Sequence, residues 1–150
     1  MTGEELLCKL YSVDLSPKRS ETADNIYNMI LSDIPDAVDI TRKQAAIIIH
    51  EYLRKILKEA DETDITRATQ LKDLYDCRVC VKHIEQVYIK GIMDPMIDSN
   101  ASLKNGLPIL FGGNELLTDE EAKTIIERVW DKSKRQKCKS TDELIEKSEN

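Results

Sequence analysis

Aromatic residues, glycine and proline are scarce in this chain of 150 residues. The chain has one Phe, one Trp and five Tyr, with only five Gly and four Pro. A core with so few aromatic side chains is aliphatic, which suits packed helices better than a β-sandwich rich in Val, Tyr and Phe. The small number of Gly and Pro leaves few tight turns. We therefore predict an all-α protein, a small bundle of helix–loop–helix units.

The chain also lacks an excess of basic residues and a long apolar run. Its net charge of −6 argues against nucleic acid as a partner, because such proteins usually carry a basic face. No stretch approaches the roughly 20 apolar residues of a membrane span. The first 16 residues have no basic start and no apolar run, unlike a secretory signal. We expect a cytoplasmic protein for the chain as given, and a cell-surface protein if an export signal was removed.

Helix starts are the clearest feature that the sequence does have. A Thr followed three residues later by Glu or Gln forms a capping box, which closes the first turn of a helix. Three pairs have this spacing: Thr2 with Glu5, Thr41 with Gln44, and Thr118 with Glu121. The helix that begins at Thr41 carries a broad apolar stripe, which places it at the centre of the bundle. The residues of this stripe are Ala45, Ile49, Tyr52, Leu53, Ile56 and Leu57.

Between the second and third capping boxes, the pattern predicts less regular structure. Residues 66–75 indicate a short connecting helix, and residues 75–93 indicate a long one that Gly91 closes in a left-handed conformation. Residues 94–117 form one long ordered loop, with a short strand near 107–111. A loop of this length in a small domain is usually functional or packed on itself.

The domain boundaries follow from the same patterns. Residues 1–139 are predicted to form a single helical domain. Residues 140–150 form an acidic tail that is loosely attached or disordered.

Two of the helix starts match beyond their caps. The segment ITRKQAAIII at 40–49 aligns with LTDEEAKTII at 117–126. Either the two are copies of one unit, or they are unrelated amphipathic helices that share a common cap. The stretch from 84 to 122 resembles the S-layer homology (SLH) module, in which a helix ends in Gly-Ile, a loop carries Phe, and Thr opens a second helix. The positions that match are Ile84, Val87, Gly91, Ile92, Phe111, Asn114, Thr118, Glu121 and Ala122. The resemblance, in short degenerate motifs, spans about residues 25–130.

This resemblance implies a binding role. SLH modules are helical, pack around a shared bundle and bind anionic cell-wall polysaccharides, and their sugar contacts include the Arg after the Thr. Arg42 takes that position, and a guanidinium can fork onto a carboxylate. Asp119 takes it in the other copy, where it would repel an anionic ligand. We therefore predict that ligand contacts come from Arg42, Lys43 and Asn114.

Cysteine and histidine offer a metal-binding alternative. Cys77, Cys80 and His83 step by three along one predicted helix, and Cys8, His50 or Cys138 would complete a tetrahedral zinc set. Thiols three residues apart within an apolar stripe are more often small core residues. We favour that second interpretation, with His50 as a packing histidine, and expect no metal and no cofactor.

The sequence as a whole favours a non-catalytic binding module, not an enzyme. Its ligand would be a protein partner or an anionic surface glycan of the cell-wall type, bound by the loop at 94–117 and the neighbouring helix ends. The main alternative is an intracellular acidic adaptor or inhibitor that blocks a basic partner protein. A Cys/His zinc protein or enzyme is a third hypothesis, although nothing in the sequence brings a thiol, an imidazole and a carboxylate together.

Overall fold

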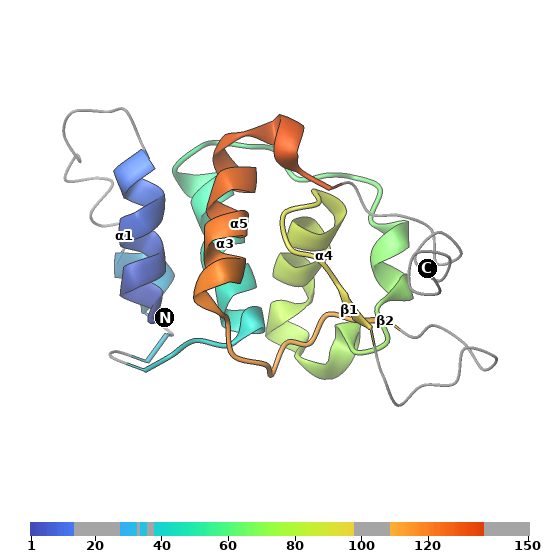
Figure 1. Cartoon of the computed structure of the whole chain (residues 1–150). Coiled ribbons are helices and arrows are strands. Elements are labelled where there is room, and N and C mark those ends of the chain that lie inside the picture. The colour runs from blue at the N-terminus through green and yellow to red at the C-terminus, as the bar shows by residue number, and fades with distance from the viewer. Residues whose placement is uncertain (14–27, 33, 36–37, 98–108, 137–150) are drawn as a thin grey trace.

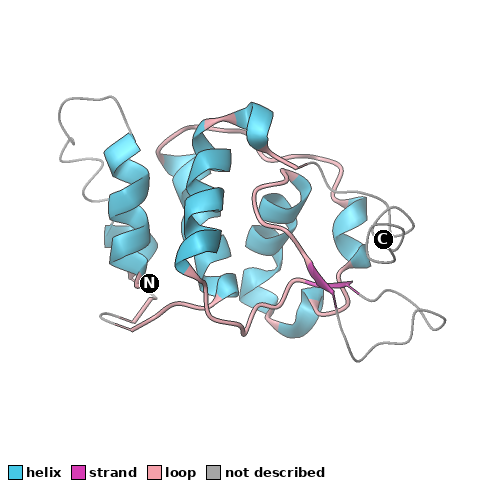
Figure 2. Ribbon diagram, in the orientation of Figure 1, coloured by secondary structure: helices cyan, strands magenta, loops and turns pink. Residues whose placement is uncertain are grey.

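The computed structural model describes residues 1–13, 28–32, 34–35, 38–97 and 109–136. Within this part lie the α-helices α1 (Gly3–Val13), α3 (Arg42–Lys55), α4 (Val81–Ile89) and α5 (Asp119–Trp130). Short 3-10 helices are η1 (Thr66–Gln70), η2 (Leu74–Asp76), η3 (Arg78–Cys80) and η4 (Lys132–Lys134). Helices dominate the ribbon in Figure 2, so the predicted all-α class is confirmed. The acidic tail at 140–150 lies outside the described residues.

The capping boxes at Thr41 and Thr118 are complete, and at Thr2 the hydroxyl half of the box is present. The hydroxyl oxygens of Thr2, Thr41 and Thr118 each accept a hydrogen bond from the backbone N–H three residues on. The helices therefore begin where the sequence placed them, because each cap satisfies backbone donors that the first turn leaves free.

The segments that lead into these three helices lie side by side. Thr2 forms an antiparallel bridge with Asp39, and Thr41 forms one with Leu116. The N–H of Ile40 donates to the Met1 carbonyl at 2.9 Å, and the N–H of Leu117 donates to the Ile40 carbonyl at 2.9 Å. These bonds tie the beginnings of α1, α3 and α5 together, and α1 contacts both other helices (Figure 1).

The long helix expected at 75–93 is wrong in extent. The structure has η2, η3 and then α4, which covers only Val81–Ile89 and packs against α3. The helix is broken at Cys77, whose backbone is extended at φ −125° and ψ 104°. Gly91 does close α4 in the left-handed region at φ +75°, as predicted. A Cβ at Gly91 would lie 2.2 Å from the Gln136 carbonyl oxygen, so glycine is also required by the close approach of the chain.

The short strand expected near 107–111 is confirmed. β2 (Ile109–Leu110) pairs antiparallel with β1 (Met96–Ile97), in the register Met96 to Leu110 and Ile97 to Ile109 (Figure 1). The pairing brings the two ends of the predicted loop together, so that residues 94–97 and 109–117 border the same region of the bundle.

Aliphatic side chains fill most of the core, as the composition predicts. The largest completely buried side chains also include three of the few aromatic residues, Tyr52, Tyr88 and Phe111. The aliphatic members of this set are Leu6, Leu10, Ile40, Ile48, Ile49, Leu53, Leu74, Ile92 and Ile109.

A partly buried charge cluster lies beyond the C-terminal end of α3. The Glu59 carboxylate accepts two hydrogen bonds from Arg135, at 2.9 and 3.0 Å, and its Oε2 lies 2.8 Å from Lys90 Nζ. Burial on its own would raise the pKa of Glu59, but the hydrogen bonds from Arg135 and Lys90 hold it below its ordinary value. Glu59 therefore links the chain after α3 to the chain after α4 and α5.

Candidate functional site

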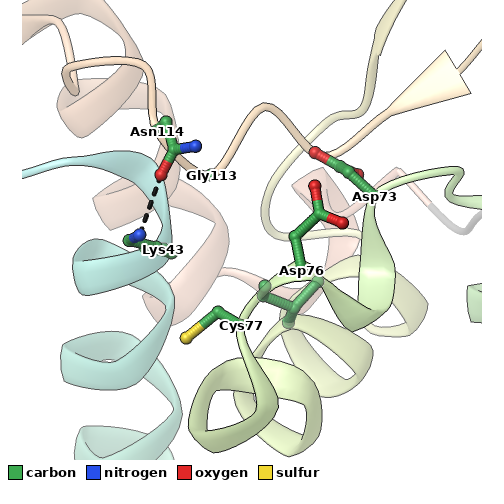
Figure 3. Close-up of a pocket in the computed structure, with 7 residues that line it drawn as sticks. Lys43, Asp73, Asp76, Cys77, Gly113 and Asn114 are labelled. Atoms are coloured by element: carbon green, nitrogen blue, oxygen red, sulfur yellow. Dashed lines mark hydrogen bonds between the residues drawn. The ribbon is translucent and has the colours of Figure 1, made fainter.

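Two of the three predicted ligand residues lie together at a surface pocket. Lys43 projects from the first turn of α3, and its Nζ donates to Asn114 Oδ1 at 2.8 Å, across 71 residues of sequence. Figure 3 shows them on one side of a pocket of about 80 Å³, with Asp73, Asp76 and Cys77 on the other side. We call this the Lys43 pocket. Its polar rim comes from a helix start, a loop and a 3-10 segment.

Two carboxylates face the lysine across the Lys43 pocket. Both oxygens of Asp73 accept backbone hydrogen bonds, from Phe111 at 2.7 Å and from Gly112 at 2.9 Å. Asp76 is exposed, and no hydrogen bond or ion pair joins its carboxylate to the described part of the chain. Asp73 therefore holds the loop in place, whereas Asp76 remains available to a ligand.

Arg42, the third predicted ligand residue, is buried with only 5% of its surface exposed. Its Nε donates to the Phe111 carbonyl at 2.9 Å, and its two terminal nitrogens donate to Glu121 and to the Asp94 carbonyl. The guanidinium carbon also lies 5.1 Å from the centre of the Phe111 ring. Arg42 thus uses its planar fork within the chain, where it joins the start of α3 to α5 and to both ends of the loop.

Arg42 also borders a second, larger groove of about 290 Å³, between α5 and the segment Ile92–Met96. Four of the charged groups here are paired with one another, Arg42 with Glu121 and Arg128 with Asp94 at 2.9 Å, whereas Glu120 is exposed. A ligand in this groove would have to compete with those pairs. The Lys43 pocket brings two of the predicted ligand residues, Lys43 and Asn114, together with the exposed Asp76 carboxylate, and we therefore take it as the candidate site.

The structure overturns the zinc alternative built on Cys77, Cys80 and His83. Cys77 and Cys80 form a disulfide, with their Cα atoms 5.2 Å apart, so neither sulfur is a thiolate that can bind a metal. Cys80 is buried as the core interpretation expects, but Cys77 lies at the pocket.

His83 instead meets His50. Their Nδ1 atoms are 2.8 Å apart, and His50 Nε2 lies 2.8 Å from Asp61 Oδ1. His50 is buried and hydrogen-bonded, in agreement with its expected packing role. Burial, followed by the neighbouring His50, lowers the pKa of His83 below its ordinary value.

Sequence reasoning did not find several residues that shape these sites. Asp61 and Asp73 lie in irregular segments and Asp76 ends a three-residue 3-10 helix, so no periodicity marks them. Glu121 was recognised as a helix cap but not as the partner of Arg42. The alignment of 40–49 with 117–126 was the nearest sequence signal for this ion pair. It matched the two helix starts that Arg42 and Glu121 connect in the structure.

No protein-family model matches this chain, and neither curated proteins nor solved structures give a significant match. Among the described residues, no helix combines the length and the apolar character that crossing a membrane requires.

Proposed function

We propose that this protein is a non-catalytic binding module, and that the Lys43 pocket captures a basic side chain of a protein partner. The observation that carries the proposal is the exposed Asp76 carboxylate facing Asn114 across a pocket of about 80 Å³. A pocket of this size takes one side chain. Asp76 and the Asn114 amide oxygen supply acceptors, and an ammonium or guanidinium group supplies the matching donors.

Charge favours a basic ligand over an anionic glycan. The cation expected to meet an anion, Arg42, is buried in contacts with its own chain. The one accessible cation of the pocket, Lys43, is opposed by Asp73 and Asp76. The net charge of −6 would also steer a basic partner toward the protein. The proposed ligand is therefore a protein, as expected for the binding module, and a basic one, as expected for the acidic adaptor.

The SLH resemblance supports the helical arrangement in this proposal more than a glycan ligand. The two aligned helix starts are neighbours, joined by the bridge between Thr41 and Leu116. In one of them Arg42 faces inward, and in the other Asp119 is exposed and acidic. Neither copy presents a free arginine to an anionic sugar.

Fluorescence anisotropy with labelled 15-residue peptides of basic, neutral and acidic composition tests the proposal, with hyaluronan as an anionic polysaccharide. We expect binding of basic peptides, weakened about tenfold by Asp76→Asn, because a charge-assisted hydrogen bond becomes a neutral one. The matched control is Glu127→Gln, which removes the same charge from an exposed position on α5. It should leave the affinity unchanged within about twofold.

Lys43→Ala separates the two ligand classes by sign. Removing this cation should strengthen the binding of a basic peptide about twofold, because a like charge leaves the pocket. Binding of hyaluronan that is lost in Lys43→Ala would establish the glycan function instead. Equal losses in Asp76→Asn and Glu127→Gln would show a general charge effect and would contradict a specific pocket.

A further inference from the structure

The two histidines of the chain, 33 residues apart, meet between α3 and α4. Their rings are arranged edge to face, with centroids 5.0 Å apart and an interplanar angle of 68°. Both direct Nδ1 toward the same point, at a separation of 2.8 Å. The rings therefore do more than pack, because two nitrogens converge on one small space.

When both imidazoles are neutral, the hydrogen bonds of the pair determine where the protons lie. The carboxylate of Asp61 accepts from His50 Nε2–H at 2.8 Å, which leaves a lone pair on His50 Nδ1. A contact of 2.8 Å between two nitrogens needs one proton between them, so His83 Nδ1 donates to His50 Nδ1. A single shared proton thus holds the two rings together.

A carboxylate borders the same space. Glu51 Oε1 lies 3.9 Å from His83 Nδ1, while its other oxygen is held by Lys55 Nζ at 2.7 Å, one turn along α3. One ligand atom from each of His50, Glu51 and His83 falls within 4.8 Å of the others. We call these three residues the histidine cluster.

We propose that the histidine cluster binds a divalent transition-metal ion of the zinc class, through Nδ1 of His50, Nδ1 of His83 and Oε1 of Glu51. Two imidazoles and one carboxylate are a ligand set that zinc favours, with a fourth position left to water. The ion takes the place of the shared proton: His83 loses its proton from Nδ1 and gains one on Nε2, so both imidazoles bind as neutral ligands and no net proton is released. This inference is independent of the Lys43 pocket and its proposed function.

The spacing of the ligand atoms suits such an ion after a small adjustment. A tetrahedral ion with bonds of about 2.0–2.1 Å holds its ligand atoms about 3.3 Å apart. The two nitrogens must separate by about 0.5 Å from their hydrogen-bonded distance, and Glu51 Oε1 must approach His83 Nδ1 by about 0.6 Å and close on His50 Nδ1 from within 4.8 Å. Both changes are within the reach of side-chain rotation.

The surroundings of the cluster also match a metal site. Histidine ligands usually donate their second N–H to a carboxylate, and Asp61 already accepts that bond from His50. The His50 side chain is 3% exposed, whereas those of His83 and Glu51 are 18% and 19% exposed. An ion would therefore enter from the side of His83 and Glu51. Two cations lie nearby, Lys55 on Glu51 and Arg54 at 3.8 Å from Asp61, and they balance the two carboxylates.

Isothermal titration of the full chain with zinc chloride, without reductant, tests this site. We expect one zinc ion per chain and little net proton release where both imidazoles are neutral, measured in buffers of different ionisation enthalpy. Cobalt chloride should give the visible absorption of a tetrahedral site. Glu51→Gln should weaken zinc binding about 100-fold, and Asp61→Asn about 10- to 100-fold, because the ligand His50 loses its orienting partner.

Matched variants separate the histidine cluster from the cysteines. The Cys77→Ser/Cys80→Ser double variant and Cys8→Ser should bind zinc like the wild type, as should Glu85→Gln, which removes a carboxylate of α4 outside the cluster. Glu51 is partly exposed, so its variant is expected to fold, and circular dichroism checks this. Absence of stoichiometric zinc in the wild type overturns the proposal. Unchanged affinity in Glu51→Gln, or a loss confined to the cysteine variants, overturns it as well.

Discussion

The Lys43 pocket and the histidine cluster both involve α3, but they are built differently. Lys43 and His50 are seven residues apart, about two turns along one side of the helix. At the pocket, Asp76 and Asn114 are both exposed, Asp76 at the end of η2 and Asn114 in a loop. At the cluster, His50 is buried and fixed by Asp61, and its partner His83 lies on α4. One site offers exposed polar groups, whereas the other offers buried or partly buried groups whose geometry is already set.

The groups of the Lys43 pocket are accessible, whereas those of the histidine cluster are preorganised. Exposed groups lose side-chain freedom when they bind, so the pocket suits a partner that also makes contacts elsewhere. Buried imidazoles with fixed partners suit a small ion, which needs defined ligand directions. Variants that act on the fold, on the pocket or on neither should therefore differ in size, and the following predictions run from the largest effect to the smallest.

Arg42→Met should have the largest effect, because Arg42 supports the loop beneath the pocket. The variant leaves the Phe111 and Asp94 carbonyls without their donor and Glu121 without its ion pair. Removing one partner of a buried ion pair lowers the free energy of unfolding by about 3 kcal/mol or more. We expect the lower end of this range, because the Glu121 side chain is a third exposed. Urea unfolding followed by circular dichroism measures the change. A loss below about 0.5 kcal/mol would show that Arg42 is not the anchor described here.

Asp73→Ala should have an intermediate effect. Its carboxylate accepts from the backbone N–H groups of Phe111 and Gly112, and both lose that acceptor. The free energy of unfolding should fall by about 2 kcal/mol. Asp76→Ala, on the same 3-10 region, is the matched control, and should change stability by less than about 0.5 kcal/mol. Equal losses in the two variants would remove the distinction between the supporting and the accessible carboxylate.

Acid should weaken the fold through Glu59, which belongs to neither site. Its pKa is lowered in the folded protein by the hydrogen bonds from Arg135 and Lys90. The unfolded chain therefore binds a proton first, and stability falls as the pH drops from about 4.5, the ordinary value, through the lower folded pKa. Stability measured against pH should show a weaker slope in this window for Glu59→Gln. An unchanged slope would assign the acid sensitivity to other carboxylates.

Lys43→Ala should have the smallest effect on stability. Lys43 makes one hydrogen bond to the exposed Asn114 at the protein surface. The free energy of unfolding should change by less than about 0.5 kcal/mol, although peptide binding changes. Together, Lys43→Ala and Arg42→Met show how much each of two neighbouring cations in the first turn of α3 contributes to stability. A loss comparable to that of Arg42→Met would mean that the pocket is part of the structural support.

Local signals in the sequence predicted much of the fold. The capping boxes located the starts of α1, α3 and α5, and Gly91 marked the end of α4. These features depend on residues close together in the chain, so one sequence is enough to find them. The prediction of one long helix at 75–93 was wrong. The apolar spacing continues through Cys77, but the backbone there is extended and Cys77 forms a disulfide with Cys80.

The candidate sites were harder to predict because they depend on distant pairs. Lys43 and Asn114 were named separately, but nothing local indicates that they meet. Arg42 was expected to face a ligand, because its partner Glu121 lies 79 residues away in sequence and could not be recognised from the residues around Arg42. The histidine cluster was found only in part: His50 was one of three candidates to complete a zinc set with His83 and two cysteines, but Glu51 was not named and His50 was preferred as a packing residue.

The most direct test of two separate sites is a ¹H–¹⁵N NMR titration of one sample with zinc chloride and of another with a basic peptide. Zinc is predicted to shift the amide signals of His50, Glu51 and His83. The peptide is predicted to shift those of Lys43, Asp76 and Asn114, and to leave the first set unchanged. A peptide that shifts neither set, or that shifts only residues outside the pocket, would contradict the proposed binding function.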